Sequence, residues 1–173
     1  MIRPATPHDA PALCAIYNPY ITDDLTSFEK EPVAEKAMAG RIRSISEDYP
    51  WLVYEQDNTI LGFAYASQWK SRHAYRFAAE TTIYLPQSTT RQGIGTPLYT
   101  ELLKRITDQG ITQAIACIAI PNPASTAFHA KLGYKEVAHF PKVGFKFDQW
   151  IDVQYWQKAL AGRATNNDTP YLD

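Results

Sequence analysis

Hydrophobic and polar residues follow two different periods along this chain of 173 residues. After a short first strand, apolar side chains recur every three or four positions, which predicts two amphipathic helices before residue 50. Thr6-Pro7-His8-Asp9 supplies an N-cap, a first-turn proline and an acidic residue for the first helix. Pro32 is expected to open the second helix. The apolar stripe expected on that helix is Val33, Ala37, Met38, Ile42 and Ile45.

From residue 51 the apolar positions take the spacing of β-strands. Runs at 51–54 and 60–65 flank Asp57-Asn58, a pair typical of a hairpin turn, and a third strand is expected at 79–85. These residues therefore predict consecutive strands that follow the two helices.

Both periods continue in the second half of the chain. Helical spacing follows Gly93-Ile94-Gly95 and ends at Gly110, and the apolar run 114–120 indicates a strand buried on both faces. Asn122-Pro123 begins another helix. Two aromatic-rich segments, 134–140 and 150–156, complete the sheet.

The order of elements is therefore βααβββαβαββ, which predicts a mixed α/β sandwich. Residues 1–160 are expected to form one domain, and the polar, unpatterned residues 161–173 a disordered tail. Hydrophobic residues make up 45% and charged residues 20% of the chain, the balance of a globular protein rather than of a disordered one.

Charge, hydropathy and cysteine content exclude several function classes. The formal net charge of −1 provides no basic surface for nucleic acid. No apolar run is long enough to span a bilayer, so we expect a soluble, cytoplasmic protein with no membrane partner. Cys14 and Cys117 are far apart and outside any metal-ligand spacing. We expect two reduced, buried thiols and no metal site.

The segment 83–98 is the most informative stretch, because a strand leads through a glycine-bearing loop into a helix. Helix N-termini attract anions, and Gly93 and Gly95 let the backbone approach one closely. Thr96 and Arg91 can add a hydroxyl and a cation. A P-loop would need a lysine before its helix, and a dinucleotide fingerprint a third glycine. The loop therefore indicates a diphosphate ligand outside the standard nucleotide sites.

With its loop reading Thr90-Arg91-Gln92-Gly93-Ile94-Gly95, the sequence resembles the GCN5-related N-acetyltransferase (GNAT) superfamily, whose acetyl-CoA motif is Gln/Arg-x-x-Gly-x-Gly/Ala. Both glycines match, and Thr90 departs from the motif. Within the superfamily the chain is similar to the phosphinothricin, methionine sulfone or methionine sulfoximine acetyltransferases. The segments that carry this narrower resemblance are 49–53, 69–75, 79–84 and 144–153.

The resemblance covers about residues 1–160 and implies a mostly antiparallel central sheet, flanked by helices, that binds acetyl-CoA. The cofactor is expected where the strand ending at Leu85 separates from the strand 114–120, with Asn122 either bonding the pantetheine or capping its helix. The cofactor-binding residues implied are Ile83, Tyr84, Leu85, Arg91, Gln92, Gly93, Ile94, Gly95, Thr96, Asn122 and Ser125.

The resemblance also points to two catalytic candidates. Glu80 is the expected general base for the acceptor amine; the alternative is an exposed acid or an ion-pair partner of Arg76. Burial should raise its pKa and suit it to that task. His129 stands where many superfamily members carry a tyrosine and is the candidate acid for the leaving thiolate; the alternative is a histidine packed in the interior.

The acceptor is expected to be a small amino-acid-like molecule. The basic, aromatic segment before Glu80 suits its carboxylate and its phosphinate or sulfone oxygens, although it could equally be a solvated loop. A peptide N-terminus, another small amine, or acyl-CoA sensing without catalysis are the alternatives. The resemblance further implies a homodimer. The substrate-binding residues expected are Phe28, Arg72, His73, Ala74 and Tyr75.

Overall fold

A computed structural model describes residues 1–86 and 93–161. The strands are β1 (Ile2–Pro4), β2 (Trp51–Gln56), β3 (Thr59–Gln68), β4 (Ala78–Tyr84), β5 (Gln113–Ile120), β6 (Lys135–Lys146) and β7 (Gln149–Ala159). The helices are α1 (Ala10–Thr22), α2 (Glu35–Ile45), α3 (Gly95–Asp108) and α4 (Pro123–Lys131), with short 3-10 turns η1 (Pro7–Asp9) and η2 (His73–Tyr75). This order confirms the predicted βααβββαβαββ arrangement.

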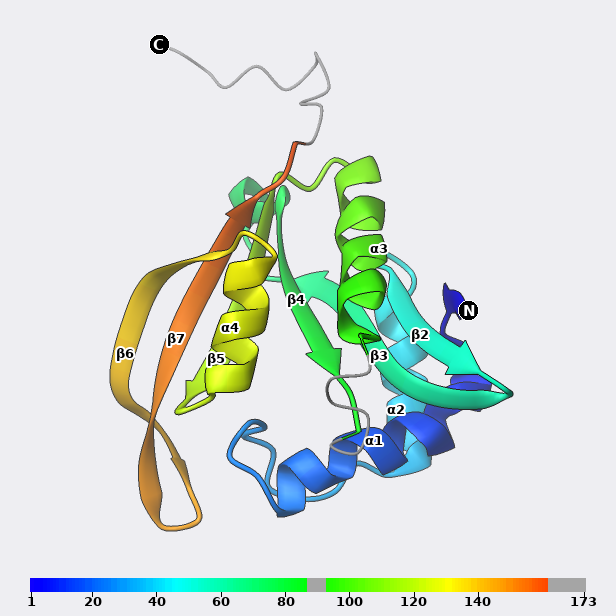
Figure 1. Ribbon diagram of the computed structural model, residues 1–173, viewed down its shortest axis with the longest axis horizontal. Helices are drawn as coiled ribbons and strands as arrows, with labels where there is room; N and C mark the ends of the chain where they lie inside the picture. Colours follow the sequence, from blue (N-terminus) through cyan, green and yellow to red (C-terminus); the bar gives the residue numbers. More distant parts are fainter. Residues whose placement is uncertain (87–92, 162–173) are drawn as a thin grey trace.

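The strands form one sheet in the order β1-β2-β3-β4-β5-β7-β6 (Figure 1). Neighbouring strands are antiparallel except for β4 and β5, which run parallel. That parallel pairing is confined to three residue pairs, from Ala78↔Gln113 to Glu80↔Ile115, after which the two strands separate (Figure 1). The prediction of a mixed, mostly antiparallel sheet flanked by helices is therefore confirmed.

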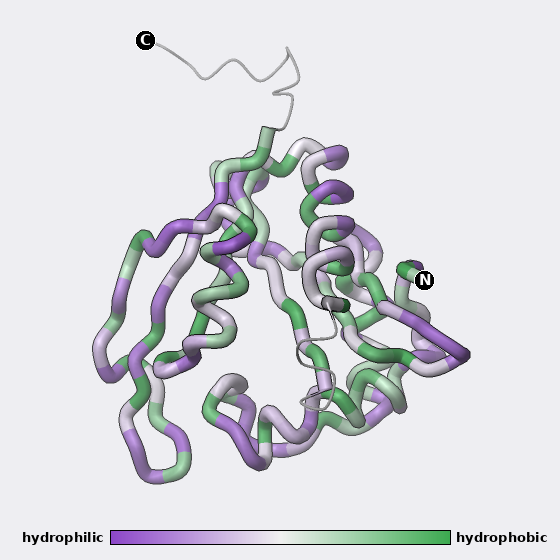
Figure 2. Tube along the Cα trace, viewed as in Figure 1, coloured by the Kyte–Doolittle hydropathy of each residue, from purple (hydrophilic) through white to green (hydrophobic). Residues whose placement is uncertain are grey.

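Each face of the sheet carries its own hydrophobic cluster. Leu98 and Leu102 of α3 are buried on one face, and Leu13 of α1 and Met38 of α2 are buried on the other, where they join Val53 of β2. Figure 2 shows the corresponding hydrophobic colouring along β5, while the tip of the β2–β3 hairpin is hydrophilic. No helix in the described ranges is long and apolar enough to cross a membrane.

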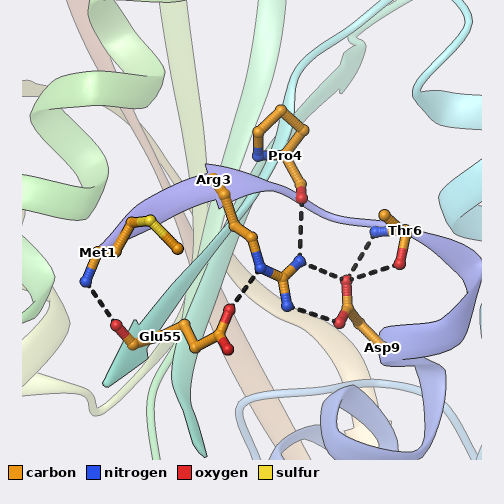
Figure 3. Close-up of polar contacts among 6 residues, drawn as sticks. All are labelled: Met1, Arg3, Pro4, Thr6, Asp9 and Glu55. Atoms are coloured by element: carbon orange, nitrogen blue, oxygen red, sulfur yellow. Dashed lines mark hydrogen bonds and ion pairs between the residues drawn. The ribbon is translucent and has the colours of Figure 1, made fainter. Parts of the chain in front are cut away.

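Arg3 connects the edge strand β1 to the adjacent strand β2 and to the turn that precedes α1 (Figure 3). Its guanidinium donates two hydrogen bonds to the Asp9 carboxylate, at 2.8 and 2.9 Å, and a third to Glu55 of β2. The same Asp9 carboxylate accepts the backbone N–H of Thr6 at 2.7 Å, as the predicted capping segment requires. The start of α1 is thereby set relative to the sheet.

The second helix begins at Glu35 rather than at Pro32. Asn18 explains the delay, because its side chain bonds both the N–H and the C=O of Val33 and holds that residue outside the helix. Val33 is still buried, but Ala37 is exposed instead of belonging to the apolar stripe. The helix thus starts about one turn later than its proline suggests.

Two other expectations were wrong. Cys14 is buried, but Cys117 is exposed. Its buried neighbours along β5, Ala116 and Ile118, point to the opposite face of the sheet. Cys117 points to the face of α1 and α2, and those helices pack mainly over β2, β3 and β4. The β6 strand also continues to Lys146, well beyond the predicted limit of residue 140, because it pairs with β7 up to Lys146↔Gln149.

We expect Val53→Ala to lower the free energy of unfolding by about 2 kcal/mol, since it removes two methyl groups from a fully buried position. Lys36→Ala is the control, because Lys36 lies on the exposed side of α2. Chemical denaturation of both variants measures the difference. Equal losses of stability would contradict the assignment of the cluster under α1 and α2 as core.

Candidate active site

A cavity of about 700 Å³ lies where β4 and β5 separate, between the N-termini of α3 and α4. Eight of the eleven residues expected to bind the cofactor line it: Ile83, Tyr84, Leu85, Gly93, Gly95, Thr96, Asn122 and Ser125. Its other lining residues were not predicted to be part of the site; they are Tyr20, Asp24, Thr26, Pro121, Pro123, Ala124 and Phe128. Segments far apart in the chain therefore converge on one hollow.

The N-terminus of α3 forms one wall of the cavity. Gly93 has a positive φ of 78°, a conformation that favours glycine. A Cβ on Gly95 would lie 3.2 Å from a Leu85 methyl carbon and 3.3 Å from the Phe128 ring, so glycine allows α3 to begin close to the end of β4. The N–H groups of Gly95 and Thr96 have no acceptor within the helix, and the positive end of the helix dipole lies beside them.

Asn122 is the N-cap of α4. Its Oδ1 accepts the backbone N–H of Ser125 at 3.0 Å, which confirms the helix-capping alternative. Both side chains also line the cavity, so Asn122 can cap the helix and face a ligand at once. The contact with pantetheine stays a prediction.

Glu80 lies on β4 at the last residue pair before the strands separate. Burial raises the pKa of its carboxyl group, and the attraction of Lys70 opposes this shift. Within residues 1–86 and 93–161 the carboxylate has no ion pair, so the structure does not support the expected alternative of a bridge to Arg76. Cys117 of β5 and Tyr155 of β7 pair in register; burial raises the pKa of both, and the nearby Glu80 carboxylate adds to each shift.

His129 is 4% exposed, and both of its ring nitrogens contact other groups of the protein. Nδ1 lies 2.8 Å from the Ser125 carbonyl oxygen, and Nε2 lies 3.1 Å from the Tyr99 hydroxyl. Because a carbonyl only accepts, we assign the proton to Nδ1, and Nε2 then accepts from Tyr99. Burial lowers the pKa of His129, which favours the same neutral form.

Tyr99 connects His129 to the point where the strands separate. Its single hydroxyl proton is shared between His129 Nε2 and Thr81 Oγ1, to which the Tyr99 hydroxyl donates at 2.8 Å. Thr81 in turn donates to the Ile115 carbonyl at 3.0 Å and accepts from the Tyr134 hydroxyl at 3.0 Å. Thr81 follows Glu80 along β4, so the two side chains point to opposite faces of the sheet. The candidate base and the candidate acid are therefore on different faces.

The sequence matches the GNAT acetyltransferase domain over residues 2–155. This chain belongs to the GNAT acetyltransferase family. It is 38% identical to the phosphinothricin N-acetyltransferase of Streptomyces viridochromogenes, over 91% of this chain and 86% of that protein. It is 29% identical to the L-methionine sulfoximine/L-methionine sulfone acetyltransferase of Pseudomonas paraeruginosa, over 92% and 94%.

The fold of this GNAT protein is also that of a phosphinothricin acetyltransferase from Sinorhizobium meliloti, solved in complex with acetyl-CoA. The two have a TM-score of 0.89 and 34% sequence identity, over 95% of this chain and 91% of that one. The resemblance found in the motifs is therefore confirmed at the level of family and fold, and the protein is an N-acetyltransferase similar to the phosphinothricin enzymes.

None of the five residues expected to bind the acceptor lines the cavity of this GNAT protein. Phe28 is 48% exposed and lies against Gly144, while Arg72, His73, Ala74 and Tyr75 are exposed before the start of β4. The cavity lies at the other end of that strand. Lys70, in the same basic segment, is nevertheless close enough to attract Glu80.

Two of the expected cofactor residues, Arg91 and Gln92, lie outside the described residues, as does the departing Thr90. Ile94 is buried, but it does not line the cavity. In the described ranges no three His, Cys, Asp or Glu side chains are grouped so that they could hold a metal ion.

We expect Tyr99→Phe to destabilise the GNAT domain by roughly 1–3 kcal/mol, because it leaves the buried Nε2 of His129 without its donor. Tyr75→Phe is the matched control, since Tyr75 is 39% exposed and its ring would still contact Trp69. Denaturant unfolding provides the measurement. If the two variants unfold alike, the hydroxyl of Tyr99 does not serve His129.

Proposed function

We propose that this protein acetylates the α-amino group of a small amino-acid analogue of the phosphinothricin, methionine sulfone or methionine sulfoximine type, with acetyl-CoA as donor. The observation that carries the proposal is the 38% identity with a phosphinothricin N-acetyltransferase across nearly the whole chain. The cavity, which lies further along β4 than Glu80 and is lined by most of the residues expected to bind the cofactor, supports it.

The residues around the cavity fit coenzyme A. The pairing of β4 with β5 ends at Glu80, so the backbone edge of β4 beyond it is open to an extended pantetheine arm. The first-turn N–H groups of Gly95 and Thr96 suit the diphosphate. Asn122 and Ser125 present side-chain oxygens from the opposite wall. Acetyl-CoA supplies an activated acetyl group and a thiol that leaves.

Glu80 is the proposed base. An α-amino group is largely protonated near neutral pH, and it must lose a proton before it can attack. A carboxylate whose pKa is raised by burial holds that proton more strongly than an exposed one. His129 remains the candidate acid. In the assigned tautomer the ring would give up its Nδ1 proton to the thiolate and take a proton from Tyr99 at Nε2, so that no imidazolium is required.

We also propose that the protein forms a homodimer in the cytoplasm. The dimer is supported by a group of exposed apolar side chains on β6, β7 and the turn between them. Such a group differs from the single exposed apolar residues that are normal on a protein surface. The group consists of Val137, Phe140, Val143, Phe145, Phe147 and Trp150.

The test is to mix the protein with acetyl-CoA and each of a panel of amines. We expect free thiol to be released fastest with phosphinothricin, methionine sulfone or methionine sulfoximine. A thiol-reactive dye measures the rate. Faster reaction with short peptides would assign the site to peptide N-termini. Stabilisation by acetyl-CoA without release of thiol from any amine would indicate an acyl-CoA sensor and overturn the enzyme assignment.

In Glu80→Gln we expect kcat to fall by about 10²–10⁴-fold while the affinity for acetyl-CoA, measured by calorimetry, is retained. Since the pKa of Glu80 is raised, its carboxylate forms only above the pH at which an exposed glutamate ionises. The kcat/KM of the wild-type protein should therefore rise with pH along an acidic limb that the variant lacks. Glu136→Gln, on exposed β6, is the control and should keep that limb. An unchanged profile in Glu80→Gln would exclude this base.

A further inference from the structure

The segment 144–153, one of those that carry the family resemblance, has no role in the cavity or in the chemistry described so far. It contains the end of β6 and the start of β7, and its hairpin lies beside the chain that follows α1 (Figure 1). Lys146 makes the contact. Its ammonium donates to three backbone carbonyls, those of Tyr20 at 3.3 Å, Asp24 at 2.6 Å and Ser27 at 2.6 Å.

Three acceptors satisfy all three N–H donors of the ammonium group. The carbonyls belong to the last turn of α1 and to the loop after it, where backbone oxygens lack intrahelical partners and a cation is favoured. Hydrogen bonds from a charged donor are also stronger than neutral ones. One side chain from a strand more than a hundred residues away therefore closes the end of α1 and orders the loop.

Gly144 provides a second contact between the same two segments. A Cβ at this position would lie 2.5 Å from two carbons of the Phe28 ring, so the ring rests directly on the backbone of β6. Gly144 is two residues from Lys146 on the strand, and the two therefore face the same side. Gly144 leaves room for the Phe28 ring, and the Lys146 ammonium bonds the loop backbone, so both residues contact the loop 23–29.

The opposite side of this loop is held by the helices. The Tyr17 hydroxyl lies 2.9 Å from Ser27 Oγ and donates to Glu29 at 2.9 Å, and Arg41 of α2 pairs with the same Glu29 carboxylate. Between these contacts, Asp24 and Thr26 line the cavity. The loop is thus fixed from α1 and α2 on one side and from β6 on the other.

We propose that Lys146 is a positioning residue that holds the loop 23–29 in the conformation that forms one wall of the cavity, with Gly144 as its steric partner. This inference rests on the proposed function, in which the cavity binds acetyl-CoA. If the loop were held correctly only part of the time, the apparent affinity for acetyl-CoA would fall in proportion to that fraction. The chemistry of molecules that do bind would change little, because Glu80 belongs to a different element.

The test is Lys146→Met, with hydrogen exchange of the loop 23–29 and steady-state kinetics as its two measurements. We expect amide exchange in the loop to become about 10-fold faster and the KM for acetyl-CoA to rise about 10-fold. The expected changes in kcat and in the KM for the acceptor are smaller than about 3-fold. Lys146→Arg should recover part of the KM for acetyl-CoA, because it keeps a cationic donor.

Gly144→Val should reproduce the same pattern by displacing Phe28. Lys135→Met is the matched control, since it removes an exposed lysine from the same strand, and it should leave both measurements unchanged. Unchanged loop exchange in Lys146→Met would overturn the proposal, and so would faster exchange with an unchanged KM for acetyl-CoA. If the wild-type protein acetylates no amine, the proposed function fails by itself, while faster exchange in the variant would still support the hold on the loop.

Discussion

β4 and β5 pair in parallel for three residues and then separate, and every group of the site is placed by that separation. Two strands that part inside a sheet leave backbone groups without ladder partners, which is costly unless other donors replace them. Thr81 provides one replacement, because its hydroxyl donates to the carbonyl of Ile115 just where the pairing ends. The N-termini of α3 and α4 then meet at the opening and contribute backbone N–H groups to the cavity between the strands.

The same strand distributes the site over both faces of the sheet. Successive residues of β4 point in opposite directions, so Glu80 faces one layer and Thr81 the other. Thr81 belongs to the buried group that includes Tyr99, Tyr134 and His129. Each member of this group has a hydrogen-bond partner, as a buried polar group requires. A neutral histidine in this position depends on the donor that Tyr99 supplies.

Local signals in the sequence predicted local structure well. The Asn122-Pro123 pair predicted the start of α4, because capping is decided within one turn. The prediction that α2 begins at Pro32 was wrong, because the side chain of Asn18, fourteen positions before that proline, holds Val33 outside the helix. The wall formed by Tyr20, Asp24 and Thr26 had no signal at all, since it depends on how the loop after α1 packs against a hairpin near the other end of the chain.

The composition of the basic segment before β4 predicted that it binds the acceptor, yet the segment lies away from the cavity. Its position is consistent with a reaction in which two substrates approach Glu80 from opposite ends of one strand. Lys70 is close enough to influence the Glu80 carboxylate from the start of β4, whereas Leu85 and Gly95 line the cavity at its end. Because the pairing of β4 with β5 ends at Glu80, an acceptor held by the basic segment and a donor held along the open edge would meet at that residue. Under the proposed function, the three-residue pairing would set where the amine and the thioester come together, and lengthening it would close the edge proposed for the donor.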